Sequence, residues 1–175
     1  MASGRSGSLA TWRRQALRRI ATVRRSTLAF IARLPENEIL RPRTQDRWSI
    51  TDVLAHLMTC DEETVRRFRL IARGQGNRIH WFESMADADR FNARSVAGAH
   101  RLRLPTLLRR MGRAHADVIK DLERLPLEAL RDPSHQYTVV DWLPAPGWSH
   151  EREHLSEIRS WWRSRRGARA ESRAR

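Results

Sequence analysis

Apolar residues recur at intervals of three and four along four long stretches of this chain. The first stripe consists of Leu9, Trp12, Ala16, Ile20, Val23, Thr27, Ile31 and Leu34. Such spacing places the residues on one face of an amphipathic helix. Comparable stripes run through 50–73, 105–125 and 146–162, and no convincing series of strands alternates with them. The pattern therefore predicts an all-α fold, a bundle of four helices.

Helix-capping residues and prolines indicate where these helices begin and end. Ser49 and Asp52 form a capping box at the start of the second helix, and Gly74 is placed to end it. Pro105 suits the first turn of the third helix, whereas Pro126 ends it.

The chain length fits one domain, since 175 residues can bury a sizeable core. We expect residues 1–8 to form a disordered N-terminus, 9–166 to form the helical bundle, and 167–175 to form a solvated basic tail.

Two long connections interrupt the helical pattern. Between the second and third helices, we expect a loop over 74–85 and a shorter helix over 87–99. Before the last helix, the proline-rich stretch 127–147 is interpreted as an extended loop.

Charge and cysteine content limit the possible partners. The formal net charge is +14, but Lys120 is the only lysine among 34 basic residues. This preference for arginine is typical of a GC-rich genome, so nucleic acid is an open but not a favoured partner. Cys60 is the only cysteine, which excludes an intrachain disulfide and makes the cytoplasm the expected compartment. No run of 18 apolar residues predicts a membrane span.

Three histidines predict a metal site. His150 and His154 are four residues apart on the last predicted helix, so their imidazoles can converge on one point. His56 is the best candidate for a third ligand, because it lies beside the apolar stripe of the second helix. Three protein ligands with an open position are typical of a catalytic divalent metal.

Other interpretations of these residues remain. A single histidine on an apolar face is usually a hydrogen-bonded core residue, and a single cysteine such as Cys60 is usually a small buried hydrophobe rather than a ligand. The stretch from His150 to His154 also matches the H-E-x-x-H pattern of zinc proteases. We do not favour a protease, because no further histidine follows and no sheet edge is available for a peptide.

Two motifs resemble those of the DinB/YfiT-like metalloproteins, a family that includes thiol-dependent S-transferases such as mycothiol-dependent maleylpyruvate isomerases. The motifs are Trp48-Ser-x-x-Asp-Val-Leu-Ala-His-Leu57 and His150-Glu-Arg-Glu-His-Leu155, on the second and last predicted helices. The resemblance implies an up-down-down-up bundle with a divalent metal, zinc or nickel, on His56, His150 and His154. It also implies that Glu153 does not bind the metal directly.

Such a site can support two kinds of chemistry. A bound metal can activate water for hydrolysis, or it can hold the sulfur of a small thiol cofactor for transfer to an electrophile. The resemblance favours the thiol route, with mycothiol, glutathione or bacillithiol as the thiol. Candidates for the pocket wall are Cys60, Trp81, Asn92, Tyr137 and Trp142.

The sequence thus predicts a metal-dependent thiol S-transferase or hydrolase acting on a small electrophilic molecule. A noncatalytic, stress-associated binding protein is one alternative, and a binder of nucleic acid or acidic surfaces through arginine-rich faces is another. A small-molecule substrate is the expected partner, a homodimer is left open, and no membrane is expected.

Overall fold

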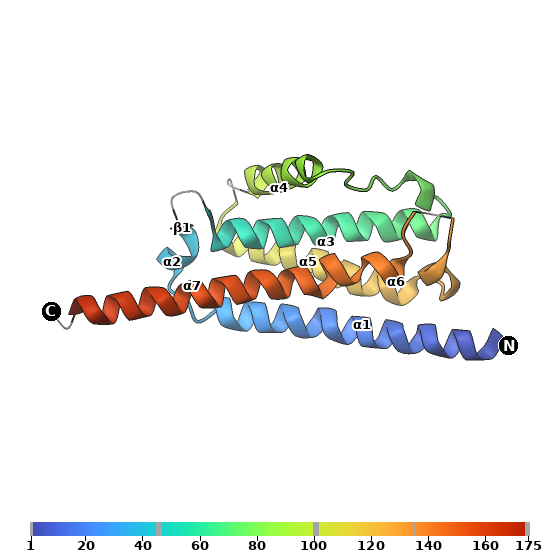
Figure 1. Ribbon diagram of the computed structural model, residues 1–175, viewed down its shortest axis with the longest axis horizontal. Coiled ribbons are helices and arrows are strands. Elements are labelled where there is room, and N and C mark those ends of the chain that lie inside the picture. Colours follow the sequence, from blue (N-terminus) through green and yellow to red (C-terminus); the bar gives the residue numbers. More distant parts are fainter. Residues whose placement is uncertain (1, 45–46, 100–101, 135, 174–175) are drawn as a thin grey trace.

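Four long helices form the body of the molecule (Figure 1). They are α1 (Ala2–Ile31), α3 (Ile50–Ala72), α5 (Leu104–Arg124) and α7 (His150–Arg173). This computed structural model describes residues 2–44, 47–99, 102–134 and 136–173 of the chain. The predicted all-α four-helix bundle is confirmed.

The four helices run in an up-down-down-up order. In Figure 1, α1 and α7 run in one direction, and α3 and α5 run in the other. Two ion pairs with the same sequence offset, Glu62 with Arg110 and Arg69 with Asp117, link α3 to α5 and confirm that these helices are parallel neighbours. The connection between α3 and α5 must therefore return along the length of the bundle.

The two long connections contain more helix than expected. The first holds a short 3-10 turn, η1 (Gly76–Arg78), and the predicted shorter helix, α4 (Met85–Ala99), which packs on α3. The second was expected to be extended, but it contains η2 (Glu128–Arg131) and α6 (Val139–Trp142). The apolar side chains of α6 turn into the core, with Val139 and Trp142 buried, so burial overrides the extended tendency of the surrounding prolines.

A small hairpin that the sequence did not predict precedes α3. Its strands are β1 (Pro42–Thr44) and β2 (Arg47–Ser49), which pair antiparallel, and the short α2 (Glu36–Leu40) lies before them. Strands of three residues are too short to produce an alternating pattern. Arg165 of α7 donates to the fully buried carboxylate of Glu38, which anchors α2 to the bundle.

The predicted helix signals at α3 are confirmed. The Ser49 side chain accepts a hydrogen bond from the Asp52 backbone, and the Asp52 carboxylate accepts one from the Ser49 backbone. Gly74, with a φ of +67°, follows the end of the helix. This capping fixes the start of α3, and with it the rotation of the face that carries His56.

Both terminal helices are longer than predicted. The first begins at Ala2 rather than at Leu9, and α7 continues through 167–173, where a tail was expected. Met1 and 174–175, which belong to the segments predicted as a disordered end and a tail, lie outside the described residues.

The core consists of two apolar clusters stacked along the bundle. One surrounds Phe68 and Leu122, and the other surrounds Leu54, Leu107 and Ile158. Among the described helices, none is long and apolar enough to cross a bilayer.

Candidate metal centre

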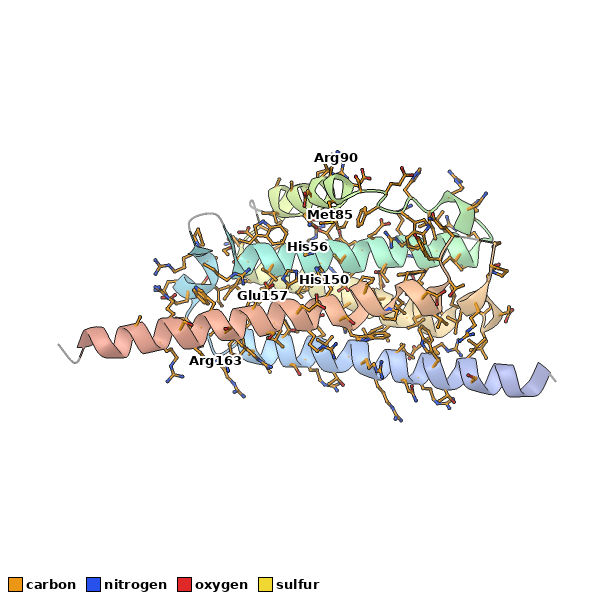
Figure 2. All side chains as sticks on the ribbon, in the orientation of Figure 1. His56, Met85, Arg90, His150, Glu157 and Arg163 are labelled. Carbon is orange, nitrogen blue, oxygen red and sulfur yellow. The ribbon has the colours of Figure 1, made fainter. Side chains whose placement is uncertain are left out.

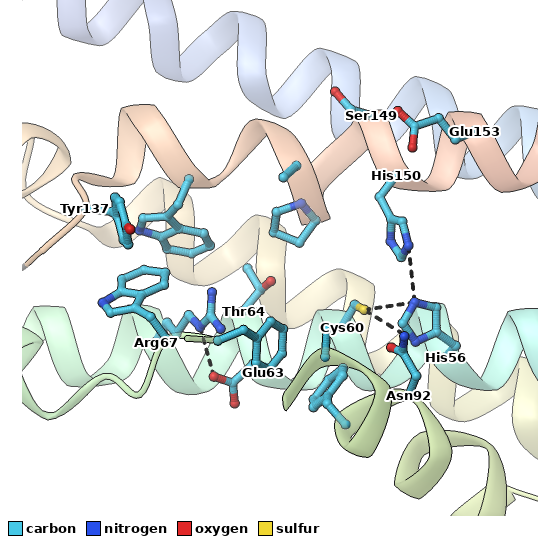
Figure 3. A pocket seen from close by; sticks show the side chains of 17 residues that line it. His56, Cys60, Glu63, Thr64, Arg67, Asn92, Tyr137, Ser149, His150 and Glu153 are labelled. Carbon is cyan, nitrogen blue, oxygen red and sulfur yellow. Dashed lines mark hydrogen bonds and ion pairs between the residues drawn. The ribbon is translucent and has the colours of Figure 1, made fainter. Parts of the chain in front are cut away.

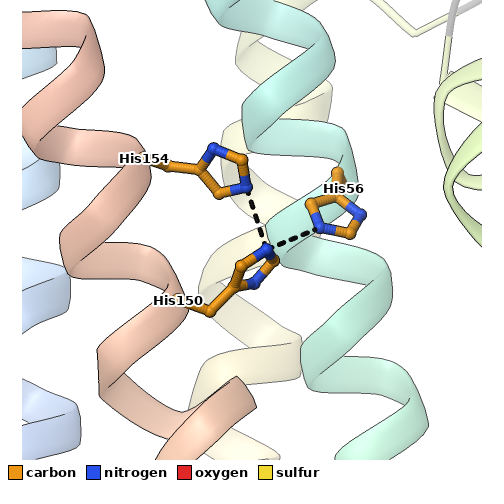
Figure 4. Close-up of side chains that lie close together, drawn as sticks. All are labelled: His56, His150 and His154. Atoms are coloured by element: carbon orange, nitrogen blue, oxygen red, sulfur yellow. Dashed lines mark hydrogen bonds between the residues drawn. The ribbon is translucent and has the colours of Figure 1, made fainter. Parts of the chain in front are cut away.

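Helices α3 and α7 bring His56, His150 and His154 together (Figure 4). The Nε2 atom of His150 lies 3.3 Å from Nε2 of His56 and 3.0 Å from Nε2 of His154. His56 is only 3% exposed, and the ligand atoms of all three residues lie within 4.8 Å of one another. Figure 2 shows His56 and His150 between α3 and α7, whereas Arg163 projects away from the bundle.

This geometry suits a metal ion. Nitrogens bound to a tetrahedral zinc at about 2.0–2.1 Å are separated from one another by about 3.3–3.4 Å, close to the spacing observed here. The Nε2 atom of His150 faces the Nε2 atoms of both other rings, and at most one of these two contacts can be an N–H···N hydrogen bond, because a neutral imidazole has only one N–H to donate. A shared cation would use all three lone pairs.

The protonation of the cluster also suits a metal. Burial, together with His150 and His154, lowers the pKa of His56 to about 3. Burial lowers the pKa of His150, and burial and His150 lower that of His154. The imidazoles are therefore neutral at pH 7, which is the form that binds a metal.

Two neighbours border the cluster. The Trp48 ring packs against His56 with centroids 5.2 Å apart, and the Cys60 sulfur lies 3.7 Å from Nε2 of His56. Burial raises the pKa of the Cys60 thiol to about 12. In the absence of a metal, Cys60 thus borders the site as a neutral thiol, and among the described residues the group close enough to share an ion consists of the three histidines.

A π-helical turn, η3 (Ala145–Ser149), leads directly into α7 and makes His150 the first residue of that helix. The sequence predicts the last helix over 146–162, with Trp148 and Ser149 departing from the ordinary helical turn of the resembled family and His150 in the first turn of the helix. A π turn contains one more residue than an α-helical turn, so the residues before it point in different directions than they would along a continuous α-helix. It leaves Trp148 buried against the core and Ser149 on the wall of the cavity beside the histidines.

Glu151, the acid of the H-E-x-x-H pattern, faces away from the histidines. It is 2% exposed and accepts hydrogen bonds of 2.9 and 3.1 Å from Nε of Arg24 on α1. Arg24 also pairs with Asp61 of α3, at 2.9 Å. A glutamate held in this way cannot act as a general base at the metal, so the protease interpretation is excluded.

A cavity of about 570 Å³ opens beside His56 and His150 (Figure 3). All five residues named as wall candidates line it: Cys60, Trp81, Asn92, Tyr137 and Trp142. The Trp81 ring lies 5.0 Å from that of Tyr137 and 5.9 Å from that of Trp142. His154 is not part of the lining, so the cavity reaches the cluster from the side of the other two histidines.

Sequence reasoning missed several residues of this cavity. Glu63, Thr64 and Arg67 of α3 line it, and Phe91 contributes from α4. The first three were recognisable in principle, because positions 60, 63, 64 and 67 continue the helical face that carries His56. The contribution of α4 depends on how the long connection folds back, which no local pattern encodes.

The family of this protein follows from the sequence as well as from the site. The model of the DinB superfamily matches residues 19–158, most of the chain and all of the elements that build the site. The chain therefore belongs to the DinB superfamily. No curated protein and no solved structure matches it significantly.

Proposed function

We propose that this protein is a metal-dependent enzyme that transfers the sulfur of a small thiol to an electrophilic molecule, with hydrolysis of such a molecule as the related alternative reaction. The observation that carries the proposal is the convergence of three neutral imidazoles at a cavity, with Nε2 atoms that hydrogen bonds among the rings cannot all satisfy.

A divalent metal, zinc or nickel, would be held by His56, His150 and His154. When bound, such a metal supplies Lewis acidity that favours the anionic form of a thiol or of water at neutral pH. The three imidazoles are neutral donors, which leaves the net positive charge of the ion available to that anion.

The remaining residues have roles that follow from their positions. Trp81, Phe91 and Trp142 provide an apolar wall that excludes water from an electrophile and orients it. Glu153 lies on the cavity wall beside His150, where its carboxylate can accept the proton that the thiol or water loses. Sulfur then bonds to the electrophilic carbon, and the leaving group departs with its bonding electrons.

The resemblance of the two motifs to thiol-dependent S-transferases supports the thiol route over hydrolysis. Mycothiol, glutathione and bacillithiol are the thiols to test.

The test combines each thiol with 1-chloro-2,4-dinitrobenzene and measures the conjugate formed by zinc- or nickel-loaded protein. A second arm omits the thiol and measures hydrolysis of p-nitrophenyl acetate. The triple variant His56→Ala, His150→Ala, His154→Ala is the control for both. Metal-dependent conjugation that the triple variant lacks would support the transferase. Hydrolysis alone would favour the alternative, and equal rates for the variant and the parent protein would contradict both.

A separate surface supports a second candidate function, the binding of an acidic partner. A groove of about 750 Å³ between α1 and α7 is lined by Arg18, Arg19, Arg152 and Arg159, and no acidic side chain lines it. Helix α1 contains no acidic residue at all. Among the described residues, these four arginines form no ion pair, which leaves their charge available to phosphates or carboxylates of a partner.

Salt dependence separates this candidate from the enzyme. Binding of a polyanion such as heparin or a short DNA duplex should weaken steeply with ionic strength and persist in the triple histidine variant. Binding that disappears in the double variant Arg18→Ala, Arg159→Ala would support the groove, and binding that survives it would contradict it.

A further inference from the structure

The cavity contains a second polar group, far from the histidines. Arg67 lies eleven residues after His56 on the same face of α3, about 16 Å along the helix axis at 1.5 Å per residue. Its side chain leans back toward the start of the helix, as helical side chains do, and lines the cavity. The side chain is only 10% exposed, so a cationic group is held almost entirely inside the protein.

Aromatic rings hold the guanidinium of Arg67 in place (Figure 3). Its central carbon lies 4.5 Å from the ring centre of Trp81, 5.5 Å from that of Trp142 and 6.0 Å from that of Phe82. Contacts with ring faces stabilise the cation and fix its plane, and they leave the N–H groups at its edge free to donate hydrogen bonds.

Only part of that edge is used within the protein. The Nε atom of Arg67 donates to Glu63 at 2.9 Å. Among the described residues, no hydrogen-bond partner faces its two terminal nitrogens. A nearly buried arginine with open terminal donors on a cavity wall is an arrangement that a ligand can complete.

Glu63 does not cancel the charge of Arg67. The same carboxylate accepts two hydrogen bonds from Arg66, from Nε at 2.7 Å and from Nη2 at 2.8 Å. Although burial opposes it, the hydrogen bonds from Arg66 and Arg67 hold the pKa of Glu63 below its usual value. One carboxylate thus lies between two guanidinium groups, and this end of the cavity keeps one net positive charge.

We infer that Arg67 is the residue that selects the substrate, by binding a carboxylate with its two terminal nitrogens. This inference rests on the proposed function, and it defines the substrate class as an elongated acid. Its reactive end lies at the histidines, its apolar or aromatic middle packs on Trp81 and Phe91, and its carboxylate reaches Arg67. A monoanion matches the single uncompensated charge better than a phosphate dianion does.

The test compares 6-phenylhexanoic acid with 6-phenylhexan-1-ol by isothermal titration calorimetry on the full chain. Neither probe contains a thiol, so the comparison is run on metal-free protein. We expect the acid to bind roughly tenfold more tightly than the alcohol, as for a charge-assisted hydrogen-bonded pair. Equal affinities, or no binding of either probe, would overturn the inference.

Two neighbouring arginines provide a matched pair of variants. Arg67→Gln and Arg66→Gln remove the same charge beside the same glutamate, but the Arg66 side chain is 45% exposed. Arg67→Gln should weaken the acid roughly tenfold and leave the alcohol unchanged, whereas Arg66→Gln should preserve the preference. Equal weakening of both probes by Arg67→Gln would show that Arg67 only braces the aromatic wall, and would overturn the inference. If Arg67→Gln unfolds, Arg67→Met, which keeps an apolar stem without the charge, replaces it with the same criteria.

A second pair of probes separates this inference from the proposed function. On metal-loaded protein, 8-sulfanyloctanoic acid should bind more tightly than 8-sulfanyloctan-1-ol, and Arg67→Gln should remove only that difference. Failure to bind metal would contradict the proposed function while leaving the metal-free comparison valid. A metal site that binds both thiols equally would contradict the role of Arg67 alone.

Discussion

Two polar clusters lie next to each other inside the bundle, and they are built in opposite ways. One contains His56, His150 and His154, and the other contains Arg24, Asp61 and Glu151. The two clusters use consecutive residues of α7, because His150 and Glu151 are adjacent in sequence and their side chains point into different parts of the interior. The same helices thus carry both clusters.

The ionic cluster pairs opposite charges among its own residues and leaves Nη1 of Arg24 without a hydrogen-bond partner in the described part of the chain. Arg24 binds one carboxylate from α3 and one from α7, and every charged member is nearly buried. Burial raises the pKa of Asp61 to about 6, even though the charge of Arg24 opposes the rise. The histidine cluster has no such pairing of opposite charges, since its members are all neutral bases whose Nε2 atoms face one another. The difference is that the ionic cluster links α1, α3 and α7 by its own charges, whereas the histidine cluster is positioned to hold a metal ion.

Loss of the ionic cluster should produce the largest effect. Arg24→Met leaves two carboxylates buried without their cation, so the free energy of unfolding should fall by about 3–5 kcal/mol. Urea denaturation measures this change. Arg25→Met, at the exposed neighbouring position, is the control and should change stability by less than about 0.5 kcal/mol. A loss for Arg24→Met as small as that of the control would mean that the cluster does not hold the helices.

The histidine cluster should respond in metal affinity rather than in stability. His56→Ala, His150→Ala and His154→Ala should each weaken zinc binding by about a hundredfold or more, since even residues beyond the ligands contribute about 10–100-fold. The helical circular dichroism should stay largely intact. Competition with a chromogenic chelator measures the affinity, and His80→Ala, an exposed histidine outside the cluster, is the control. Stoichiometric metal retained in all three variants would refute the site.

Acid should weaken the metal-free protein through His115, which lies 3.9 Å from Asp61. Burial, and then the charge of Arg24, lowers the pKa of His115 to about 4. Between about pH 6.5 and pH 4 the unfolded chain binds a proton that the native chain does not, so stability falls as pH falls through this window, by at most about 1.4 kcal/mol per pH unit.

The raised pKa of Asp61 has the opposite effect on stability. Between about pH 6 and the lower pKa that Asp61 has in the unfolded chain, the native chain binds the extra proton, so this group gains stability as the pH falls. Arg24 and Glu151 are among the charged groups around it. His115→Gln should therefore reduce the loss of stability between pH 7 and pH 5 in urea titrations. An unchanged loss would assign the acid sensitivity to other groups.

The smallest effect should come from Glu157. Its carboxylate lies 3.6 Å from Nδ1 of His154, and its side chain is 55% exposed. Because outer partners of metal-bound histidines orient the ring, Glu157→Gln should weaken zinc binding by about tenfold or less. Glu123→Gln, on the surface of α5, should leave the affinity unchanged. A loss as large as that of a histidine variant would place Glu157 among the ligands.

The sequence predicted the features that depend on local patterns. The stripes of apolar residues predicted the four helices, and the Ser49 and Asp52 capping box predicted the start of α3. The spacing of His150 and His154 predicted their convergence, because residues four apart always share a helical face. The juxtaposition of His56 with that pair depended on which helix faces which, and the family resemblance supported it.

Other features depend on contacts between distant segments. Arg24 lies four residues after Ile20 and three before Thr27, so its spacing places it on the buried face of α1, but no local pattern identifies Glu151 as its partner. The sequence marks the turn before His150 as a departure from an ordinary helical turn, but it does not reveal that this is a π turn whose Trp148 packs into the core. Arg67 shares a helical face with His56, but its aromatic neighbours come from the two different connections. Trp81 follows Arg67 by 14 positions and Trp142, in α6, follows it by 75, so only the tertiary fold brings both rings to the guanidinium.

Metal content tests the central claim most directly. Elemental analysis should be made on protein purified without a histidine tag and supplied with zinc and nickel, beside the variant in which His56, His150 and His154 are all alanine. The three converging imidazoles predict close to one metal ion per chain in the parent protein and none in the variant. No metal in the parent protein, or the same metal content in both, would contradict the account.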